Sequence, residues 1–215
     1  MDRNKITRTK ILDAAEAIFA EVGYHGASLR AVTSKARVNL AAVNYHFLDK
    51  QGLYHAVLTR RLEPINRVRL AELAAAEDAA GENPVGTSLI LRIFFRPLFD
   101  LAASTASQDS SALRIIGRSL TDPIDFLPAV LATDLHPTTA RFSQALRRHA
   151  PGLHPEEFLW RISFIIGALH HALATMHAMK NLTNGICRNN DYRGAEDRLV
   201  RAASAILQAP SGSVR

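Results

Sequence analysis

The stretch SLRAVTSKARVNLAAVNYHFLDK, residues 28–50, decides the fold of this 215-residue chain. Ser28 is a good helix N-cap, because its hydroxyl can accept a hydrogen bond from a free backbone amide in the first turn. Leu29, Val32 and Ala36 then recur at helical spacing on one face. The pattern predicts a first short helix that ends near Ala36.

A second short helix is expected after a turn at residues 37–38. Asn39 can cap this helix, and Leu40, Val43 and Phe47 repeat in it at intervals of three and four residues. Two short helices joined by a tight turn are typical of helix-turn-helix proteins, whose second helix lies in the major groove of DNA. The stretch therefore predicts a DNA-binding surface.

Residues 5–58 resemble the N-terminal segment of TetR-type transcriptional regulators. The resemblance rests on many residues at fixed offsets in one order, namely Thr7-Arg8, Ile11-Leu12, Ala14-Ala15, Phe19, Gly23, Ser28-Leu29, Tyr45-His46-Phe47 and Lys50. It implies an all-α fold, with a three-helix DNA-binding domain followed by a larger helical domain for effector binding and dimerisation. It also implies a homodimer that acts as a repressor on a palindromic operator.

The chain departs from the family pattern at two positions. Arg37 stands in the turn where the family usually has glycine. If this position needs a positive φ, the arginine carries a strain of about 1 kcal/mol. Asn44 stands where a tyrosine is usual, and its amide could pair with adenine.

The second helix supplies the residues that we expect to contact DNA. Leu40, Ala41, Asn44 and Tyr45 form the expected base-contacting set, in which apolar groups meet thymine methyls and polar groups meet base edges. For Leu40 and Ala41, simple helix propensity is an alternative explanation of why these residue types occur there. From the resemblance, the phosphate-contacting residues are Thr7, Arg8, Ser28, Tyr45, His46 and Lys50. For His46, a structural hydrogen bond is an equal alternative.

The positive charge is concentrated at the same end of the chain. The net charge is +6, and residues 1–61 hold ten Lys and Arg against five Asp and Glu, whereas residues 62–215 carry only +1. A solvated basic surface would explain charge alone. Its coincidence with the helix-turn-helix pattern favours DNA, because a basic patch releases counterions from the phosphates.

The sequence predicts a DNA-binding domain at residues 1–52, a helical effector-binding and dimerisation domain at 53–209, and a disordered tail at 210–215. The expected helices outside the motif are 7–22, 51–76, 88–103, 112–120, 126–135, 138–149, 155–180 and 192–207. Pro64 should kink or divide the second of these, and the Gly- and Pro-containing stretch 77–87 should form a loop.

Composition excludes several other classes. The single cysteine, Cys187, cannot form an internal disulfide, and the charged N-terminus has no apolar signal-peptide core, so we expect a cytoplasmic protein without a membrane span. No GxSxG, HExxH, Walker, GxGxxG or CxxC motif occurs. His170 and His177 share a helix face without a carboxylate at the spacing of a metal pair. We therefore expect no enzyme, cofactor or metal site.

Dimerisation is expected through two apolar helices near the C-terminus. The expected interface residues are Trp160, Phe164, Gly167, Ala168, His171, Leu199, Ala203 and Ile206. Such helices could form a four-helix interface with their symmetry mates, or they could simply fill the core of the monomer.

The central helices should enclose an apolar effector pocket. Its expected lining is Ile93, Phe94, Leu98, Phe99, Ile116, Leu120, Phe126, Leu127, Val130 and Leu131, although periodicity cannot separate pocket wall from ordinary core. A carboxylate could be held by Arg92, Arg96, Arg114 or Arg118.

The segments VNYHF and FLWRISFIIGA are similar to those of TetR relatives that respond to fatty acids. This similarity implies a fatty acid or its coenzyme A ester as the hydrophobic effector. The alternative function is an architectural DNA-binding protein without an effector, although DNA binding alone would need only the first third of the chain.

Overall fold

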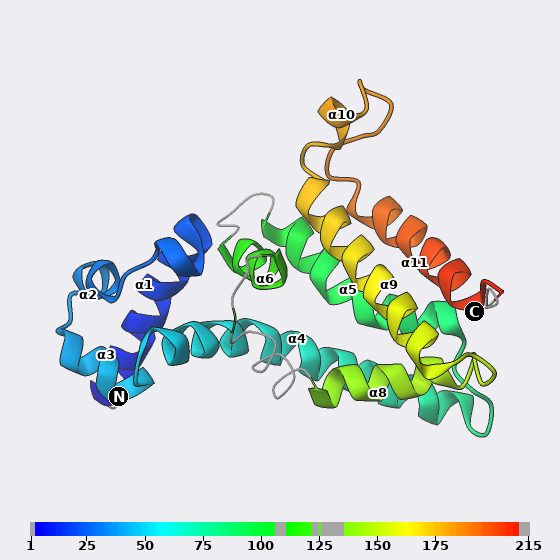
Figure 1. Cartoon of the computed structure of the whole chain (residues 1–215), viewed down its shortest axis with the longest axis horizontal. Coiled ribbons are helices and arrows are strands. Elements are labelled where there is room, and N and C mark those ends of the chain that lie inside the picture. Colours follow the sequence, from blue (N-terminus) through cyan, green and yellow to red (C-terminus); the bar gives the residue numbers. More distant parts are fainter. Residues whose placement is uncertain (1–2, 106–110, 122–124, 126–135, 211–215) are drawn as a thin grey trace. The chain divides into compact units, whose positions relative to one another are not determined.

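A computed structural model describes residues 3–105, 111–121, 125 and 136–210, and these residues form ten helices and no strand (Figure 1). The all-α fold expected from the sequence is confirmed. The chain divides into two compact units. The N-terminal unit comprises residues 1–64 and 108–135, and the C-terminal unit comprises residues 65–107 and 136–215. Helix α4 (Lys50–Ala80) runs through both, with the division at Pro64.

The N-terminal unit is built around its first helix. Its helices are α1 (Arg3–Gly26), α2 (Leu29–Ala36), α3 (Leu40–Phe47), α4 as far as Pro64, and α6 (Ser111–Thr121). Helix α1 packs against α2, α3 and α6. In the core, the ring of Phe19 meets that of Tyr54 edge to face, with 4.9 Å between the ring centres. The helical geometry of α1 breaks at Gly23, whose φ of 72° suits glycine.

The C-terminal unit is organised around α5, which packs against α8, α9 and α11. Its helices are the rest of α4 from Ile65, α5 (Thr87–Thr105), α8 (His136–Arg147), α9 (Pro155–Thr175), α10 (Met179–Leu182) and α11 (Tyr192–Gln208). Apolar residues recur on more than one side of α5, where Ile90, Phe95 and Phe99 are fully buried. A helix with apolar residues on several sides has to lie inside a bundle.

Several expected boundaries differ from the observed ones. Pro64 does not end α4, and the loop before α5 is shorter than expected, because α4 continues to Ala80. The residues EDAA at 77–80 favour a helix, and Glu77 forms an ion pair with Arg141 of α8. The expected helix 126–135 lies outside the described residues. The domain boundary expected between residues 52 and 53 stays a prediction. The two compact units of the structure divide α4 at Pro64.

A buried carboxylate joins three helices of the N-terminal unit. Glu16 of α1 is only 2% exposed. Both its oxygens accept hydrogen bonds from Arg60 and Arg61 of α4, and its Oε1 also accepts one from the Ser111 hydroxyl of α6 at 3.0 Å. Burial raises the pKa of Glu16, but the hydrogen bonds and charges of the two arginines outweigh it, so the pKa lies below its ordinary value of 4.5.

We predict that Glu16→Gln lowers the free energy of unfolding at pH 7 by about 2 kcal/mol, because it removes the charge between two partly exposed arginines. The folded-state pKa of Glu16 is lowered, so its contribution is present above pH 4.5 and is lost as the pH falls through the folded value. Urea unfolding should show the difference between wild type and variant shrinking below pH 4.5. Glu21→Gln, an exposed change on the same helix, is the control. A difference in unfolding free energy that is the same at every pH would contradict the lowered pKa of Glu16.

The turn between α2 and α3 is a left-handed helix cap at Arg37, whose φ and ψ are 55° and 48°. The amide of Arg37 donates to the Ser34 carbonyl at 3.3 Å, and the amide of Val38 donates to the Thr33 carbonyl at 3.1 Å. This pair of bonds is the Schellman motif, which favours glycine at the left-handed position. The positive φ considered from the sequence is therefore present at a non-glycine residue.

We predict that Arg37→Gly raises the free energy of unfolding by about 0.5 kcal/mol, because relief of the left-handed strain exceeds the entropic cost of glycine. Arg30→Gly removes the same charge from the exposed side of α2. It should destabilise by about 1 kcal/mol, because its position is helical. Chemical denaturation of both variants measures the two changes, and destabilisation by both would refute the strain argument.

Candidate functional site

Two side-chain caps fix the starts of the helices in the motif. The Ser28 hydroxyl oxygen accepts from the Ala31 amide at 3.2 Å, and Asn39 Oδ1 accepts from the Ala42 amide at 2.9 Å. Each bond satisfies one of the free amides of a helix N-terminus. The apolar faces of the two helices then point inward, with Val32 and Ala36 of α2 and Val43 and Phe47 of α3 buried.

The opposite face of α3 is open to solvent and contains the four residues expected to contact bases. Leu40, Ala41, Asn44 and Tyr45 are all exposed, and Tyr45 is 75% exposed. Residues three and four positions apart lie next to one another on a helix surface, which makes neighbours of residues 40 and 44, 41 and 44, and 41 and 45. The structure thus brings an isobutyl group, a methyl group, an amide and a phenol together on one face.

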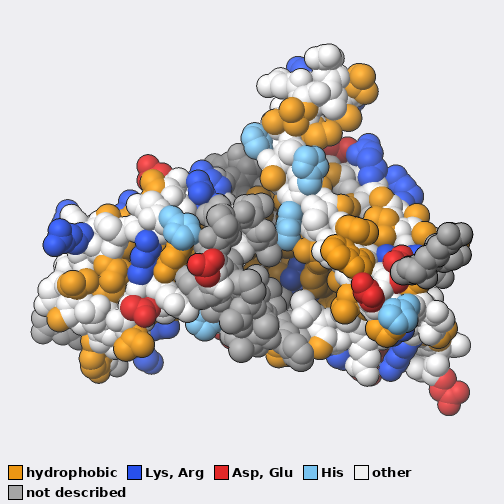
Figure 2. All heavy atoms as spheres, in the orientation of Figure 1, with side chains coloured by type: hydrophobic (Ala, Val, Ile, Leu, Met, Phe, Trp, Pro, Cys, Tyr) orange, Lys and Arg blue, Asp and Glu red, His pale blue; other side chains and the backbone are white. Residues whose placement is uncertain are grey.

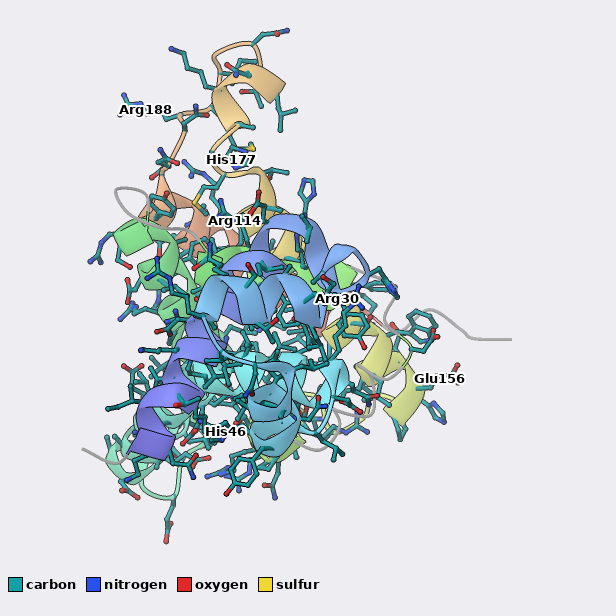
Figure 3. The ribbon with its side chains drawn as sticks, turned by 90° about the vertical axis from the view of Figure 1, so that its left-hand side faces the viewer. Arg30, His46, Arg114, Glu156, His177 and Arg188 are labelled. Carbon is teal, nitrogen blue, oxygen red and sulfur yellow. The ribbon has the colours of Figure 1, made fainter. Side chains whose placement is uncertain are left out.

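Basic and aromatic groups flank this face. The guanidinium of Arg8 lies 5.3 Å from the ring centre of Phe47, and the ammonium of Lys50 lies 4.5 Å from that of Tyr24. Burial lowers the pKa of Lys50. The half-buried His46 ring contacts the rings of both neighbours, Tyr45 and Phe47, and Figure 3 shows it on the N-terminal unit together with Arg30 of α2. These contacts hold the flanking groups in defined positions.

The other residues expected to contact phosphates differ in how far their polar groups are exposed and free of other bonds. Thr7 is half-buried on α1. The Ser28 oxygen accepts its capping bond, so its O–H can still donate to a phosphate. Of the ten basic residues in 1–61, Arg60 and Arg61 are engaged by acidic residues of α1. Among the side chains that the structure describes on α1 and α2 and in the turn, the exposed basic ones are Lys5, Arg8, Lys10, Arg30, Lys35 and Arg37.

Sequence reasoning missed the junction of α3 and α4. Asp49 Oδ1 accepts from the Gly52 amide at 2.8 Å and so occupies the N-terminus of α4, beside Lys50. A Cβ at Gly52 would collide with the Phe47 carbonyl oxygen, so only glycine fits there. Asp49 stands directly before a run of residues with helical periodicity, and this is a capping signal that could have been noticed. The close approach of two backbones leaves no signal in one sequence.

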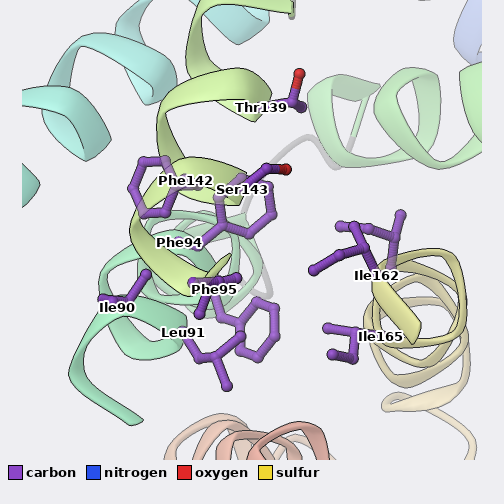
Figure 4. A pocket seen from close by; sticks show the side chains of 11 residues that line it. Ile90, Leu91, Phe94, Phe95, Thr139, Phe142, Ser143, Ile162 and Ile165 are labelled. Carbon is purple, nitrogen blue, oxygen red and sulfur yellow. The ribbon is translucent and has the colours of Figure 1, made fainter. Parts of the chain in front are cut away.

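The C-terminal unit contains an apolar cavity between α5, α8 and α9 (Figure 4). Its empty space is about 450 Å³, including the part that is open to solvent. The lining consists of Ile90, Leu91, Phe94, Phe95, Thr139, Phe142, Ser143, Leu146, Ile162, Ile165 and Ile166. A lining of this apolar character suits a small hydrophobic molecule.

The residues expected to line a pocket are distributed over both units. Phe94 lines the cavity, whereas Ile93, Leu98 and Phe99 are buried in the C-terminal unit without lining it. Ile116 is buried in the N-terminal unit. The side chain of Leu120 and all of Phe126, Leu127, Val130 and Leu131 lie outside the described part of the chain.

Helix α9 presents hydrophobic side chains to solvent, as Figure 2 shows. Trp160 and Phe164 are 54% and 58% exposed, and the exposed residues Gly167 and His171 continue the same helix face. The other expected interface residues lie deeper: Ala168 and Ile206 are half-buried, and Leu199 and Ala203 are buried within the unit. An exposed apolar stripe of this kind favours an interaction surface.

By length and composition, α9 is also the one described helix that could cross a membrane, with a mean hydropathy of 1.2 over its most apolar window. One such helix is weak evidence for a span. Among the described residues, no group of three or more His, Cys, Asp or Glu lies close enough together to hold a metal ion.

Comparison with known families gives two matches that together cover most of the chain. Residues 11–57 match the family described as "Bacterial regulatory proteins, tetR family", and residues 92–205 match "Tetracyclin repressor-like, C-terminal domain". The second match alone covers more than half of the chain.

Curated relatives are similar mainly in the N-terminal part. The HTH-type transcriptional regulator UidR of Escherichia coli K12 is 34% identical over 74 residues, which cover 31% of this chain and 38% of UidR. The HTH-type transcriptional repressor Rv1474c of Mycobacterium tuberculosis is 34% identical over 74 residues, or 34% of this chain and 37% of that protein. The chain therefore matches less than two fifths of the length of these relatives.

Solved structures extend the likeness of fold to nearly the whole chain. A putative tetR family regulator from Shewanella sp. PV-4 has a TM-score of 0.63 at 13% identity, covering 91% of this chain and 97% of that one. A putative TetR-family regulator from Mesorhizobium loti has a TM-score of 0.58 at 20% identity, covering 97% and 98%. The helix-turn-helix motif and both family matches lead to one conclusion: the chain belongs to the TetR family of transcriptional regulators, a family of DNA-binding proteins and not of enzymes.

Proposed function

We propose that the chain acts as a homodimeric repressor, which binds a palindromic operator through α3 and leaves it when a hydrophobic small molecule fills the cavity of the C-terminal unit. The observation that carries this proposal is the exposed face of α3. Leu40, Ala41, Asn44 and Tyr45 present apolar, amide and phenol groups side by side, within the segment 1–61, which carries most of the net positive charge of the chain. These groups match the methyls and the hydrogen-bonding edges of the major groove.

Contacts to phosphates would position this face on the duplex. The end of α3 is surrounded by Arg8, Tyr45, His46 and Lys50. The Ser28 hydroxyl lies at the start of α2. Phosphate contacts set the register of a protein on DNA, and base contacts supply the specificity. Asp49 beside Lys50 opposes phosphate approach at the start of α4, so the basic side chains of α1 and α2 carry more of the attraction.

A symmetric dimer would place two copies of α3 on successive half-sites of the operator. The exposed stripe of Trp160, Phe164, Gly167 and His171 on α9 supports dimerisation. Small Gly167 allows close approach of a second helix, and the two aromatic side chains supply apolar area. Leu199 and Ala203 would support α11 from within, because they are buried in the monomer.

The cavity between α5, α8 and α9 favours an effector over a purely architectural role. A DNA-binding protein without an effector has no need for an apolar cavity, whereas a ligand that prefers one conformation shifts the population toward it. We place the protein in the cytoplasm, where operator and effector are both accessible, and assign the exposed face of α9 to a second copy of the chain and not to a membrane.

We predict that Asn44→Ala weakens binding to the selected palindromic duplex by about 1–3 kcal/mol and leaves binding to scrambled DNA unchanged. Asn44 is exposed, so the fold should not suffer. Fluorescence anisotropy with both duplexes measures the ratio of the two dissociation constants. Gln144→Ala removes an exposed amide from α8 and should change neither affinity. An equal loss on both duplexes would show that Asn44 contacts the backbone and does not contact bases.

We predict that Phe164→Glu raises the dissociation constant of the dimer about 100-fold, because it places a charge inside an apolar interface. Sedimentation velocity at micromolar concentration measures the effect. Leu182→Glu changes an equally exposed apolar side chain on α10 and should leave the dimer intact. A wild-type monomer, or a variant that dimerises normally, would contradict this interface.

A further inference from the structure

The cavity of the C-terminal unit has a lining that indicates which chemical class of effector it accepts. Nine of its eleven lining side chains are hydrocarbon, and the other two are the hydroxyls of Thr139 and Ser143. These two residues are four positions apart, so they lie on one face of α8. Figure 4 shows Ser143 on the side of α8 that faces Ile162 and Ile165 of α9.

The arginines of α5 that could have held a carboxylate are engaged outside the cavity. The Arg92 guanidinium binds Asp197 and Glu196 of α11, and Arg96 Nε donates to Glu196 at 3.4 Å. Neither arginine lines the cavity. The other two candidates, Arg114 and Arg118, belong to α6 of the N-terminal unit. An anionic headgroup in the cavity would therefore have to compete with two carboxylates for Arg92 or Arg96.

A buried cation contacts one of the side chains that line the cavity. Arg69 of α4 is 4% exposed, and its guanidinium lies 3.9 Å from the ring centre of Phe94. Its Nε donates to the Phe94 carbonyl at 2.7 Å and its Nη1 to Asn66 Oδ1 at 3.1 Å. Burial lowers the pKa of Arg69 to about 9.

Arg69 does not line the cavity, whereas Phe94 does. A ligand in the cavity consequently meets the ring of Phe94 and not the guanidinium beside it. The ring is held there by its contact with the cation and by the bond to its own backbone carbonyl. The Nη2 of Arg69 is buried without a hydrogen-bond partner among the described residues, but Arg69 does not line the cavity, and we assign it to the support of the cavity wall.

The segments between α5 and α8 whose backbone the structure does not describe contain no lysine or arginine. Residues 106–110 and 122–124 contain no Lys, Arg or His, and neither do residues 126–135. They contain Asp109, Asp122 and Asp134. Moving an ionised carboxylate into hydrocarbon surroundings without a partner is far more costly than moving a hydroxyl or carbonyl that gains a hydrogen bond.

We propose that the effector is a neutral, mainly hydrocarbon molecule with one hydroxyl or carbonyl oxygen, which is hydrogen-bonded by Ser143. This inference rests on the proposed regulatory function and names the ligand class of its cavity. It replaces the fatty acid or coenzyme A ester implied by resemblance, since a free acid or a polyphosphate ester would bring charge to a wall of hydrocarbon and hydroxyl groups.

Three probes with the same eight-carbon chain separate the headgroups: 1-octanol, octanoate and octylamine, titrated calorimetrically into the full chain at pH 7.5. 1-Octanol should bind at least tenfold more tightly than either ion. Octanoate binding as tightly as 1-octanol, or no binding of 1-octanol, would overturn the proposal. Operator binding by the same preparation is measured separately. If the chain does not bind an operator, the regulatory function is refuted. If it binds octanoate more tightly than 1-octanol, only the neutral ligand class is refuted.

Two variants locate the bound probe. Ser143→Ala should weaken 1-octanol about threefold to tenfold, the effect of one neutral hydrogen bond, and Ser104→Ala, whose hydroxyl bonds the Leu101 carbonyl, should have no effect. Ile162→Phe should fill the cavity and abolish binding, with unchanged helicity by circular dichroism. Undiminished binding by Ser143→Ala or by a folded Ile162→Phe protein would show that the probe binds elsewhere and would overturn the assignment.

Discussion

The carboxylate of Glu16 is the interaction on which the arrangement of the DNA-binding unit depends. A buried carboxylate is costly unless it is paired, and here two arginines of α4 and the hydroxyl of Ser111 supply the partners. The bonds fix α1, which carries α2 and α3 on its side, to the first part of α4 and to α6. Because α4 continues past Pro64 into the C-terminal unit, the same helix that holds the motif also supplies Arg69, which supports Phe94 in the cavity wall.

The motif itself could be predicted because its determinants are local. Ser28 and Asn39 cap the helices that follow them, and the periodicity of α2 and α3 separates buried from exposed faces. Even the left-handed turn was foreseeable from the position of Arg37, although an arginine there departs from the usual glycine. The face of α3 is therefore predictable from the sequence alone, and what it contacts remains a proposal about DNA.

The remaining features depend on contacts between segments far apart in the chain. The need for Gly52 arises from the backbone of Phe47, and the burial of Glu16 arises from α4 and α6. Apolar residues occur on several sides of α5, so periodicity could not distinguish Phe94, which lines the cavity, from its neighbour Ile93, which does not. Adjacent helical residues point about 100° apart, and only the positions of α8 and α9 decide which direction faces the cavity.

The most direct test of the account is selection of random duplex DNA by the full chain, followed by sequencing of the bound fraction and determination of the stoichiometry of the complex. The exposed face of α3 and the apolar stripe of α9 predict an enriched inverted repeat, with half-site centres about one helical turn or a multiple of it apart, bound by two copies of the chain. Enrichment of a single asymmetric site by one copy, or retention of DNA without any sequence preference at all salt concentrations, would contradict the account.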